Sequence, residues 1–235
     1  VADQELATEL AEIGVILLMF GVGLHFSLKD LLSVKAIAIP GALGQIAAAT
    51  LLGMGLAWLL GWSLGAGLIF GLALSVASTV VLLRALQEQR IVESGRGRIA
   101  VGWLIVEDLV GWVAGLGMNT VTATLLITAV KVGLFILLML VVGRRLIPMI
   151  MHYVAHTGSR ELFRLAVLAI AIGVAYGSAK LFGVSFALGA FFAGMVLAES
   201  PLSHQAAKET LPLRDAFAVL FFVSVGMLFN PAVLI

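Results

Sequence analysis

The chain has 235 residues, of which 62% are hydrophobic and 11% charged, and its mean hydropathy is +1.16. Soluble globular domains contain about 45–50% apolar and about 25% charged residues, so the composition excludes an ordinary soluble domain and predicts an all-α polytopic membrane protein. The formal net charge of +1 gives no indication of a nucleic-acid partner. Cysteine is absent, which excludes a disulfide framework and a thiolate metal site.

Apolar runs long enough to cross a bilayer recur along the whole chain. A spanning helix needs about 20 apolar residues, within a range of about 17–25. By this rule the sequence predicts about eight transmembrane helices, over residues 12–28, 37–60, 65–86, 99–117, 121–143, 162–182, 184–199 and 213–230. The intervening segments are short, so we expect a single transmembrane domain over residues 1–235, with its acidic opening at the membrane interface.

The basic residues predict how these helices are oriented. Of the 14 Lys and Arg residues, all but Lys131 and Lys180 fall on one side of the predicted helices. The residues on that side are Lys29, Lys35, Arg84, Arg90, Arg96, Arg98, Arg144, Arg145, Arg160, Arg164, Lys208 and Arg214. The positive-inside rule puts this side in the cytoplasm. We therefore expect a multi-pass membrane protein with both chain ends outside the cytoplasm.

Two adjacent carboxylates, Glu107 and Asp108, lie inside the predicted span 99–117. A charged group at the bilayer centre costs at least about 2.5–3.5 kcal/mol on insertion scales, and such groups usually face a bundle interior or an ion path. Neighbours on a helix point about 100° apart, so one can line a path while the other bonds to another helix. The pair predicts a site that exchanges a proton for a cation; the alternative is a purely structural pairing with a basic residue such as Lys131.

Three hydroxyl residues, Ser75, Ser78 and Thr79, lie in the middle of the predicted span 65–86. Transporters open helices near the membrane midplane, where hydroxyls, carbonyls and helix ends contact ions. The alternative is that these hydroxyls bond back to carbonyls of their own helix, which then stays regular. No Gly or Pro interrupts this stretch, so spacing alone favours the regular helix.

Other polar residues give weaker signals. His152 and His156 are four residues apart, but a zinc site needs a third ligand and the H-E-x-x-H pattern is missing, so we expect no metal site. Neither a G-x-G-x-x-G fingerprint nor a P-loop is present, and we expect no cofactor. Gln45 either lines an ion path or bonds between helices.

Five longer stretches are informative in combination. They are GVILLMFGVGLHFSLKDL (14–31), ALSVASTVVLLRALQE (73–88), GWLIVEDLV (102–110), SFALGAFFAGMVLAES (185–200) and LRDAFAVLFFVSVGMLFNP (213–231). Together they resemble the membrane domain of the monovalent cation:proton antiporter-2 family, which includes the Kef-type potassium efflux systems. The resemblance covers nearly the whole chain.

The resemblance implies a partial inverted-repeat fold of the sodium/proton-antiporter type. It implies that Asp108 carries the proton and the cation, and that residues 75–79 belong to a broken crossing helix. Glu107 stands where Kef-type proteins have Gln and many sodium-type relatives have a carboxylate. The family's first two helices, about three later helices and the cytoplasmic nucleotide-binding domain have no counterpart here, so we expect a fragment of a protein that is a homodimer at full length.

These observations favour one function over three others. The leading interpretation is antiport of a monovalent cation, K⁺ or Na⁺, against H⁺ in a lipid bilayer, by a protein that is not an enzyme. A gated, channel-like potassium efflux pathway and a non-transporting truncated membrane subunit remain alternatives. An intramembrane aspartyl protease needs two aspartates facing each other from different helices, whereas Asp108 is the only aspartate placed deep in a predicted span.

Overall fold

The computed structural model describes residues 4–116 and 123–227, and every regular element in these ranges is a helix. Helices suit a bilayer because each satisfies its own backbone hydrogen bonds without water. The helices fall into two compact units, named here by their place in the sequence. The central unit is Leu28–Lys131, and the flanking unit combines Val1–Ser27 with Val132–Ile235.

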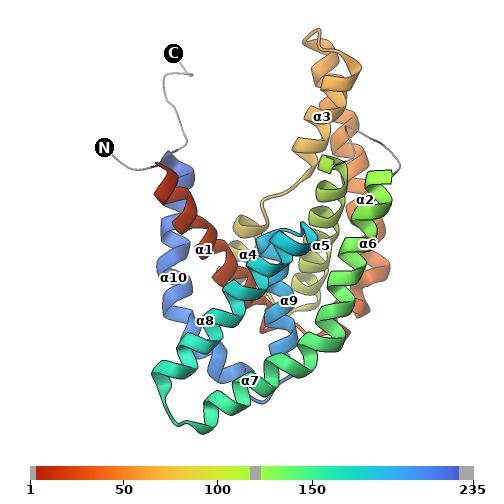
Figure 1. Cartoon of the computed structure of the whole chain (residues 1–235). Coiled ribbons are helices and arrows are strands. Elements are labelled where there is room, and N and C mark those ends of the chain that lie inside the picture. The colour runs from red at the N-terminus through yellow and green to blue at the C-terminus, as the bar shows by residue number, and fades with distance from the viewer. Residues whose placement is uncertain (1–3, 117–122, 228–235) are drawn as a thin grey trace. The chain divides into compact units, whose positions relative to one another are not determined.

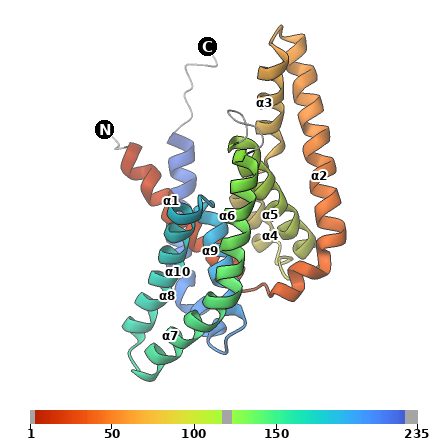
Figure 2. The same ribbon diagram turned by 45° about the vertical axis from the view of Figure 1, so that its right-hand side comes forward.

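The central unit is built on a long helical hairpin. It contains α2 (Leu28–Leu59), α3 (Leu64–Ser75), α4 (Thr79–Glu88), α5 (Gly95–Leu116) and the first part of α6 (Ala123–Leu138). In Figures 1 and 2, α2 and α3 run side by side. The turn between them passes through Gly61, whose φ of +77° favours glycine, and Ser63 Oγ then caps α3 by accepting from Ala66 N.

Small residues let the helices of the central unit approach closely. A methyl group at Gly71 of α3 would overlap the carbonyl of Thr50 on α2. Gly102 of α5 faces α2 in the same way, because a Cβ there would lie 3.1 Å from Ala38 Cβ. In lipid there is no hydrophobic driving force between helices, so close packing of this kind contributes to their association. The hairpin thus fixes the position of α5, which carries Glu107 and Asp108.

The flanking unit packs α1 (Gln4–Gly23) between α9 (Phe186–Ala198) and α10 (Ser203–Met227). The unit also contains the end of α6, the π-helical turn η1 (Met139–Gly143), α7 (Arg144–His156), α8 (Arg160–Gly177) and a second π-helical turn, η2 (Ser178–Phe182). Gly23 of α1 fits against the Phe191 carbonyl of α9, and Gly14 fits against the Phe217 carbonyl of α10. A methyl group at either glycine would overlap the facing carbonyl.

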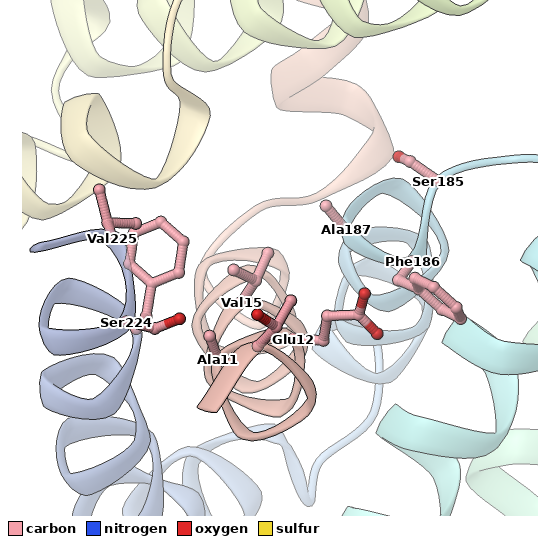
Figure 3. A pocket seen from close by; sticks show the side chains of 10 residues that line it. Ala11, Glu12, Val15, Ser185, Phe186, Ala187, Ser224 and Val225 are labelled. Carbon is pink, nitrogen blue, oxygen red and sulfur yellow. The ribbon is translucent and has the colours of Figure 1, made fainter. Parts of the chain in front are cut away.

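A cavity of about 370 Å³ opens where these three helices of the flanking unit meet. Figure 3 shows Val15 and Glu12 of α1 facing it, with Phe186 from the start of α9 and Ser224 from α10. The one carboxylate on its wall, that of Glu12, is exposed. By contrast, Glu107 is the only charged residue that is buried in the part of the chain that the structure describes, and it belongs to the central unit.

The eight predicted spans correspond to eight helical segments of the described residues. Five of them are long and apolar enough to cross a membrane: Leu28–Leu59, Leu64–Glu88, Val130–His156, Arg160–Phe182 and Ser203–Met227. The other three are α1 and α5, which carry acidic residues within their apolar sequence, and α9, which is apolar but short. The all-helical, polytopic membrane fold is therefore confirmed.

Two helices extend well beyond their predicted limits. The span predicted to end at residue 143 continues without a break through η1 and α7 to His156, and α10 begins at Ser203 rather than at residue 213. Both extensions contain charged residues. A hydropathy criterion assigns such residues to loops, although here they continue the helix. The limits predicted at residues 117, 121 and 230 lie outside the described residues. The single transmembrane domain stays a prediction, since the chain divides into two compact units.

Candidate functional site

The helix predicted over residues 65–86 is broken in its middle. Helix α3 ends at Ser75 and α4 begins at Thr79, with Val76 (φ −87°, ψ 110°) and Ser78 (φ −71°, ψ 103°) in extended conformations between them. Ser78 Oγ caps α4 by accepting from Val81 N at 3.5 Å. The break that the family resemblance implied is confirmed, whereas spacing alone had favoured a regular helix.

Side chains from two other helices satisfy backbone groups at this break. Gln45 of α2 donates from Nε2 to the carbonyl oxygen of Ser75 at 3.0 Å. Glu107 of α5 accepts at Oε2 from the N–H of Ala77 at 3.2 Å. Each unsatisfied backbone group in hydrocarbon costs several kcal/mol. These two contacts explain how the helix stays open without glycine or proline.

Glu107 is held by N–H donors on both of its oxygens. Besides the bond from Ala77, its Oε1 accepts from Trp103 Nε1 at 2.9 Å, and the residue is only 2% exposed. Two accepting oxygens suit an ionised carboxylate, which has no proton to donate. No ion pair involving Glu107 or Lys131 occurs among the described residues, and Lys131 is exposed. Pairing with Lys131 is therefore not what holds this carboxylate.

Asp108 reaches the other end of the same break. Its Oδ1 accepts a hydrogen bond at 3.2 Å from the hydroxyl of Thr79, which is the first residue of α4. Within the described residues Oδ2 makes no hydrogen bond or ion pair, and the side chain is partly exposed. Adjacent carboxylates that point about 100° apart on α5 thus both meet the break, because Ala77 and Thr79 lie on either side of Ser78.

The other predicted site residues have different surroundings. Ser75 is buried, but its hydroxyl donates to Leu72 O of its own helix at 2.7 Å, so its carbonyl is the part that faces α2. Ser78 is exposed and serves as the cap of α4. Ion contacts by Ser75, Ser78 and Thr79 stay predictions. Trp103 was missed by the sequence analysis, although its position four residues before Glu107 puts the two on one face of α5.

A cavity of about 460 Å³ adjoins this site inside the central unit. Of the candidate site residues Ser75, Ser78, Thr79, Glu107 and Asp108, Glu107 is the one that lines it. The remaining lining residues are Gln45, Ala77, Leu82, Arg96, Ile99, Ala100, Trp103 and Leu104. The wall is thus mostly apolar, with the carboxylate of Glu107 and the amide of Gln45 at the helix break and the exposed Arg96 as its one cationic side chain.

The two histidines on α7 bond within their own helix. His156 Nδ1 lies 2.9 Å from His152 O, and the rings are 4.3 Å apart. In residues 4–116 and 123–227 no group of three or more His, Cys, Asp or Glu residues is arranged to hold a metal ion.

Comparison of the sequence with known proteins identifies relatives of this chain. The "Putative cation/proton antiporter YbaL" of Escherichia coli (strain K12) is 66% identical over 249 aligned residues, which cover all of this chain and 45% of YbaL. An "Uncharacterized protein in phaC 3'region" of Methylorubrum extorquens is 61% identical over 87% of this chain and 82% of its own length. The "Glutathione-regulated potassium-efflux system protein KefC" of Enterobacter sp. (strain 638) is 31% identical over 97% of this chain and 38% of KefC.

The chain thus spans less than half the length of YbaL and of KefC. A family model described as "Sodium/hydrogen exchanger, transmembrane" matches residues 1–235, the whole chain. This chain therefore belongs to the transmembrane sodium/hydrogen exchanger family.

Proposed function

We propose that this chain forms the ion-binding part of a monovalent cation:proton antiporter, with Asp108 as the exchanging carboxylate. The observation that carries the proposal is the attachment of two adjacent carboxylates of α5 to one broken helix. Glu107 accepts from Ala77 N and Asp108 accepts from Thr79 Oγ1, both at 3.2 Å. YbaL is named as a cation/proton antiporter and KefC as a potassium-efflux protein, and both names agree with this chemistry.

The broken helix offers a suitable electrostatic setting for exchange. The end of α3 carries the negative end of a helix dipole, which favours a cation, and the start of α4 carries a positive end, which favours a carboxylate. When Asp108 is ionised, its free Oδ2 is available to a cation. When Asp108 is protonated, its negative charge is gone and the cation is released. One proton therefore replaces one monovalent cation at this carboxylate.

Glu107 has a different part in the same proposal. Both of its oxygens accept hydrogen bonds from N–H groups, so it holds the break open. The neighbouring Asp108 is less constrained and partly exposed, which suits a group that must gain and lose a proton. This division of roles agrees with the resemblance, since Kef-type proteins have Gln at the position of Glu107.

The setting of this activity is proposed along with it. The helices would lie in the inner membrane of a bacterium with the Arg- and Lys-rich side in the cytoplasm and both described ends outside it. K⁺ and Na⁺ are both accommodated by carboxylate, hydroxyl and carbonyl oxygens. The homodimer that the resemblance implies would belong to a full-length protein.

Competition between cation and proton tests the proposal. Equilibrium binding of ²²Na⁺ and ⁸⁶Rb⁺, the latter standing in for K⁺, is measured on the purified chain in detergent across a pH series. We expect the apparent Kd to rise as the pH falls, since protonation and cation binding exclude each other at Asp108. Binding that is independent of pH would favour the channel-like alternative, and the absence of binding would favour the non-transporting subunit.

Exchange itself is measured separately, in proteoliposomes with a pH-sensitive dye. Transporters of this kind use two broken helices from inverted repeats at the membrane midplane. The described residues contain one such helix, the pair α3 and α4. We therefore expect binding but no cation/proton exchange from the 235-residue chain reconstituted alone. Exchange at a rate typical of complete antiporters would contradict this expectation.

A further inference from the structure

A cavity of about 620 Å³ lies between α8 and α10 of the flanking unit. Its wall combines the beginning of α8 with one face of α10, because residues three or four positions apart on a helix point the same way. The polar lining residues are Arg160 and Arg164 of α8, and Gln205, Lys208 and Glu209 of α10. The two carboxylates of the proposed ion site belong to the other unit, so that site does not account for this cavity.

Positive charge exceeds negative charge on this wall, since three lining residues are cationic and one is a carboxylate. Arg164 Nε forms an ion pair with Glu209, whose side chain is only 14% exposed, and this pair fixes the direction of Arg164. Arg160 and Lys208 are exposed and form no ion pair within the described residues. Two cationic side chains on neighbouring helices are thus left without a negative partner.

The beginning of α8 adds to the preference for an anion. Arg160 is the first residue of this 18-residue helix, and the N-terminal end of a helix dipole carries a partial positive charge. Glu161 follows in the same turn but does not line the cavity, and its Oε2 accepts from Ser159 Oγ at 3.2 Å. This carboxylate is engaged at the helix cap, so the cavity keeps its excess of positive charge.

The cavity adjoins the charged ends of two candidate membrane spans. These are Arg160–Phe182, which α8 opens, and Ser203–Met227, which is α10. Both ends lie on the side that we place in the cytoplasm. Large apolar side chains are exposed close to the basic ones in the sequence, since Leu165 is 62% and Leu211 is 43% exposed. A ligand at this level of the membrane meets cations with its head group and apolar side chains with its tail.

We infer that this cavity binds the phosphate of an anionic phospholipid from the cytoplasmic leaflet, with Arg160 and Lys208 as its charged partners. Basic pockets between transmembrane helices on the cytoplasmic side suit anionic head groups. Gln205 adds an amide N–H donor for a phosphate oxygen, while Pro212 and Leu213 give the wall an apolar part for the glycerol and the first methylenes. A free phosphate would use the same cations but not the exposed leucines. The inference does not depend on the role proposed for Asp108.

Lipid titrations of the purified 235-residue chain in neutral detergent test this site. Native mass spectrometry measures the Kd for phosphatidylglycerol and for phosphatidylcholine, which has the same phosphate but no net charge. Inorganic phosphate is then added as a competitor. The neutral variant combines Arg160→Gln with Lys208→Gln, and the charge-keeping variant combines Arg160→Lys with Lys208→Arg. The control combines Lys35→Gln with Arg145→Gln, which removes two exposed cations that do not line this cavity. Circular dichroism checks the helix content of every variant.

We expect the wild type to bind phosphatidylglycerol more tightly than phosphatidylcholine. The neutral variant should raise the Kd for phosphatidylglycerol about tenfold or more, because each Lys or Arg near an anionic surface contributes about fivefold. The charge-keeping and control variants should bind as the wild type does.

Three results would overturn the inference without bearing on the proposed function. An unchanged Kd in the neutral variant, or an equal rise in the control, would mean that this cavity does not select the lipid. Equal Kd values for the two lipids in the wild type would show that it does not select negative charge. Displacement of phosphatidylglycerol by an equal concentration of inorganic phosphate would assign the cavity to a soluble phosphate and not to a lipid.

Discussion

The backbone N–H of Ala77 donates to Oε2 of Glu107 at 3.2 Å, so a carboxylate of α5 occupies the place that a carbonyl of the preceding turn would have in a regular helix. The opening of the helix and the burial of the charge thus have one cause. Without Glu107 the N–H of Ala77 would lack this partner, and without the break Glu107 would lose one of its two donors. The break in the helix and the buried carboxylate of Glu107 therefore depend on each other.

Asp108→Asn is expected to abolish pH-dependent cation binding while leaving the fold intact. The amide keeps the size of the side chain and can still accept from Thr79 Oγ1, but it cannot ionise. The measurement is ²²Na⁺ and ⁸⁶Rb⁺ binding across a pH series, with circular dichroism to report helix content. Asp215→Asn, which changes an aspartate of α10 in the flanking unit, is the control and should bind as wild type does. Wild-type pH dependence in Asp108→Asn would remove Asp108 from its proposed role.

Glu107→Gln is expected to be milder in binding but to lower stability. One amide oxygen can replace only one of the two accepting oxygens, so either Ala77 N or Trp103 Nε1 loses its acceptor, at about 1–3 kcal/mol. Trp103→Phe removes the side-chain donor, and the double variant Glu107→Gln with Trp103→Phe should recover part of the loss. A double-mutant cycle on the unfolding free energy measures this coupling. Additive losses would mean that the two side chains do not interact.

The positions of most helices follow from hydropathy alone. Long apolar runs such as Leu64–Glu88 and Arg160–Phe182 leave few alternatives in a bilayer, and the predicted spans 65–86 and 162–182 lie within them. The ends were harder to predict where charge continues a helix, as at Arg144 and Arg145. No capping residue ends the helix at this point. Gly143 lies in a helical conformation, and the chain passes directly into α7.

The site was only partly predictable from the sequence. Glu107 and Asp108 are conspicuous because charge is costly at membrane depth. The break at Ser75–Thr79 cannot be recognised from its local sequence. Its stabilising contacts come from Gln45, thirty residues before Ser75, and from Glu107, thirty residues after Ala77. Local propensity cannot report contacts of that sequence separation. The division of labour between two adjacent carboxylates likewise depends on which donor each one meets.

Thr79→Val is expected to weaken cation binding at constant pH, and Thr79→Ser to preserve it. Valine has the same shape as threonine but cannot donate to Asp108 Oδ1, so the carboxylate loses the hydrogen bond that orients it toward the break. Serine keeps the hydroxyl. The Kd for both ions at a single alkaline pH, where proton competition is smallest, compares the three proteins. Equal Kd values for Val and Ser would show that the hydroxyl of residue 79 does not position Asp108.

Gly41→Ala is expected to damage the site from a distance, through Trp103. The three atoms nearest to a Cβ built at Gly41 all belong to the Trp103 ring, so an added methyl must displace the indole that donates to Glu107 Oε1. Overpacking of this kind costs about 1–3 kcal/mol, which exceeds the gain of up to about 1 kcal/mol from replacing glycine by alanine in a helix.

Gly44→Ala is the matched control for this substitution. It lies one turn further along the same helix, and a Cβ there would have nothing within 4 Å, so alanine should leave the unfolding temperature unchanged or raise it. We expect Gly41→Ala to lower the unfolding temperature and to weaken cation binding together, since both depend on the contact between Trp103 and Glu107. If Gly41→Ala lowered stability without changing the Kd, the bond from Trp103 would serve the packing of α2 against α5 and not the ion site.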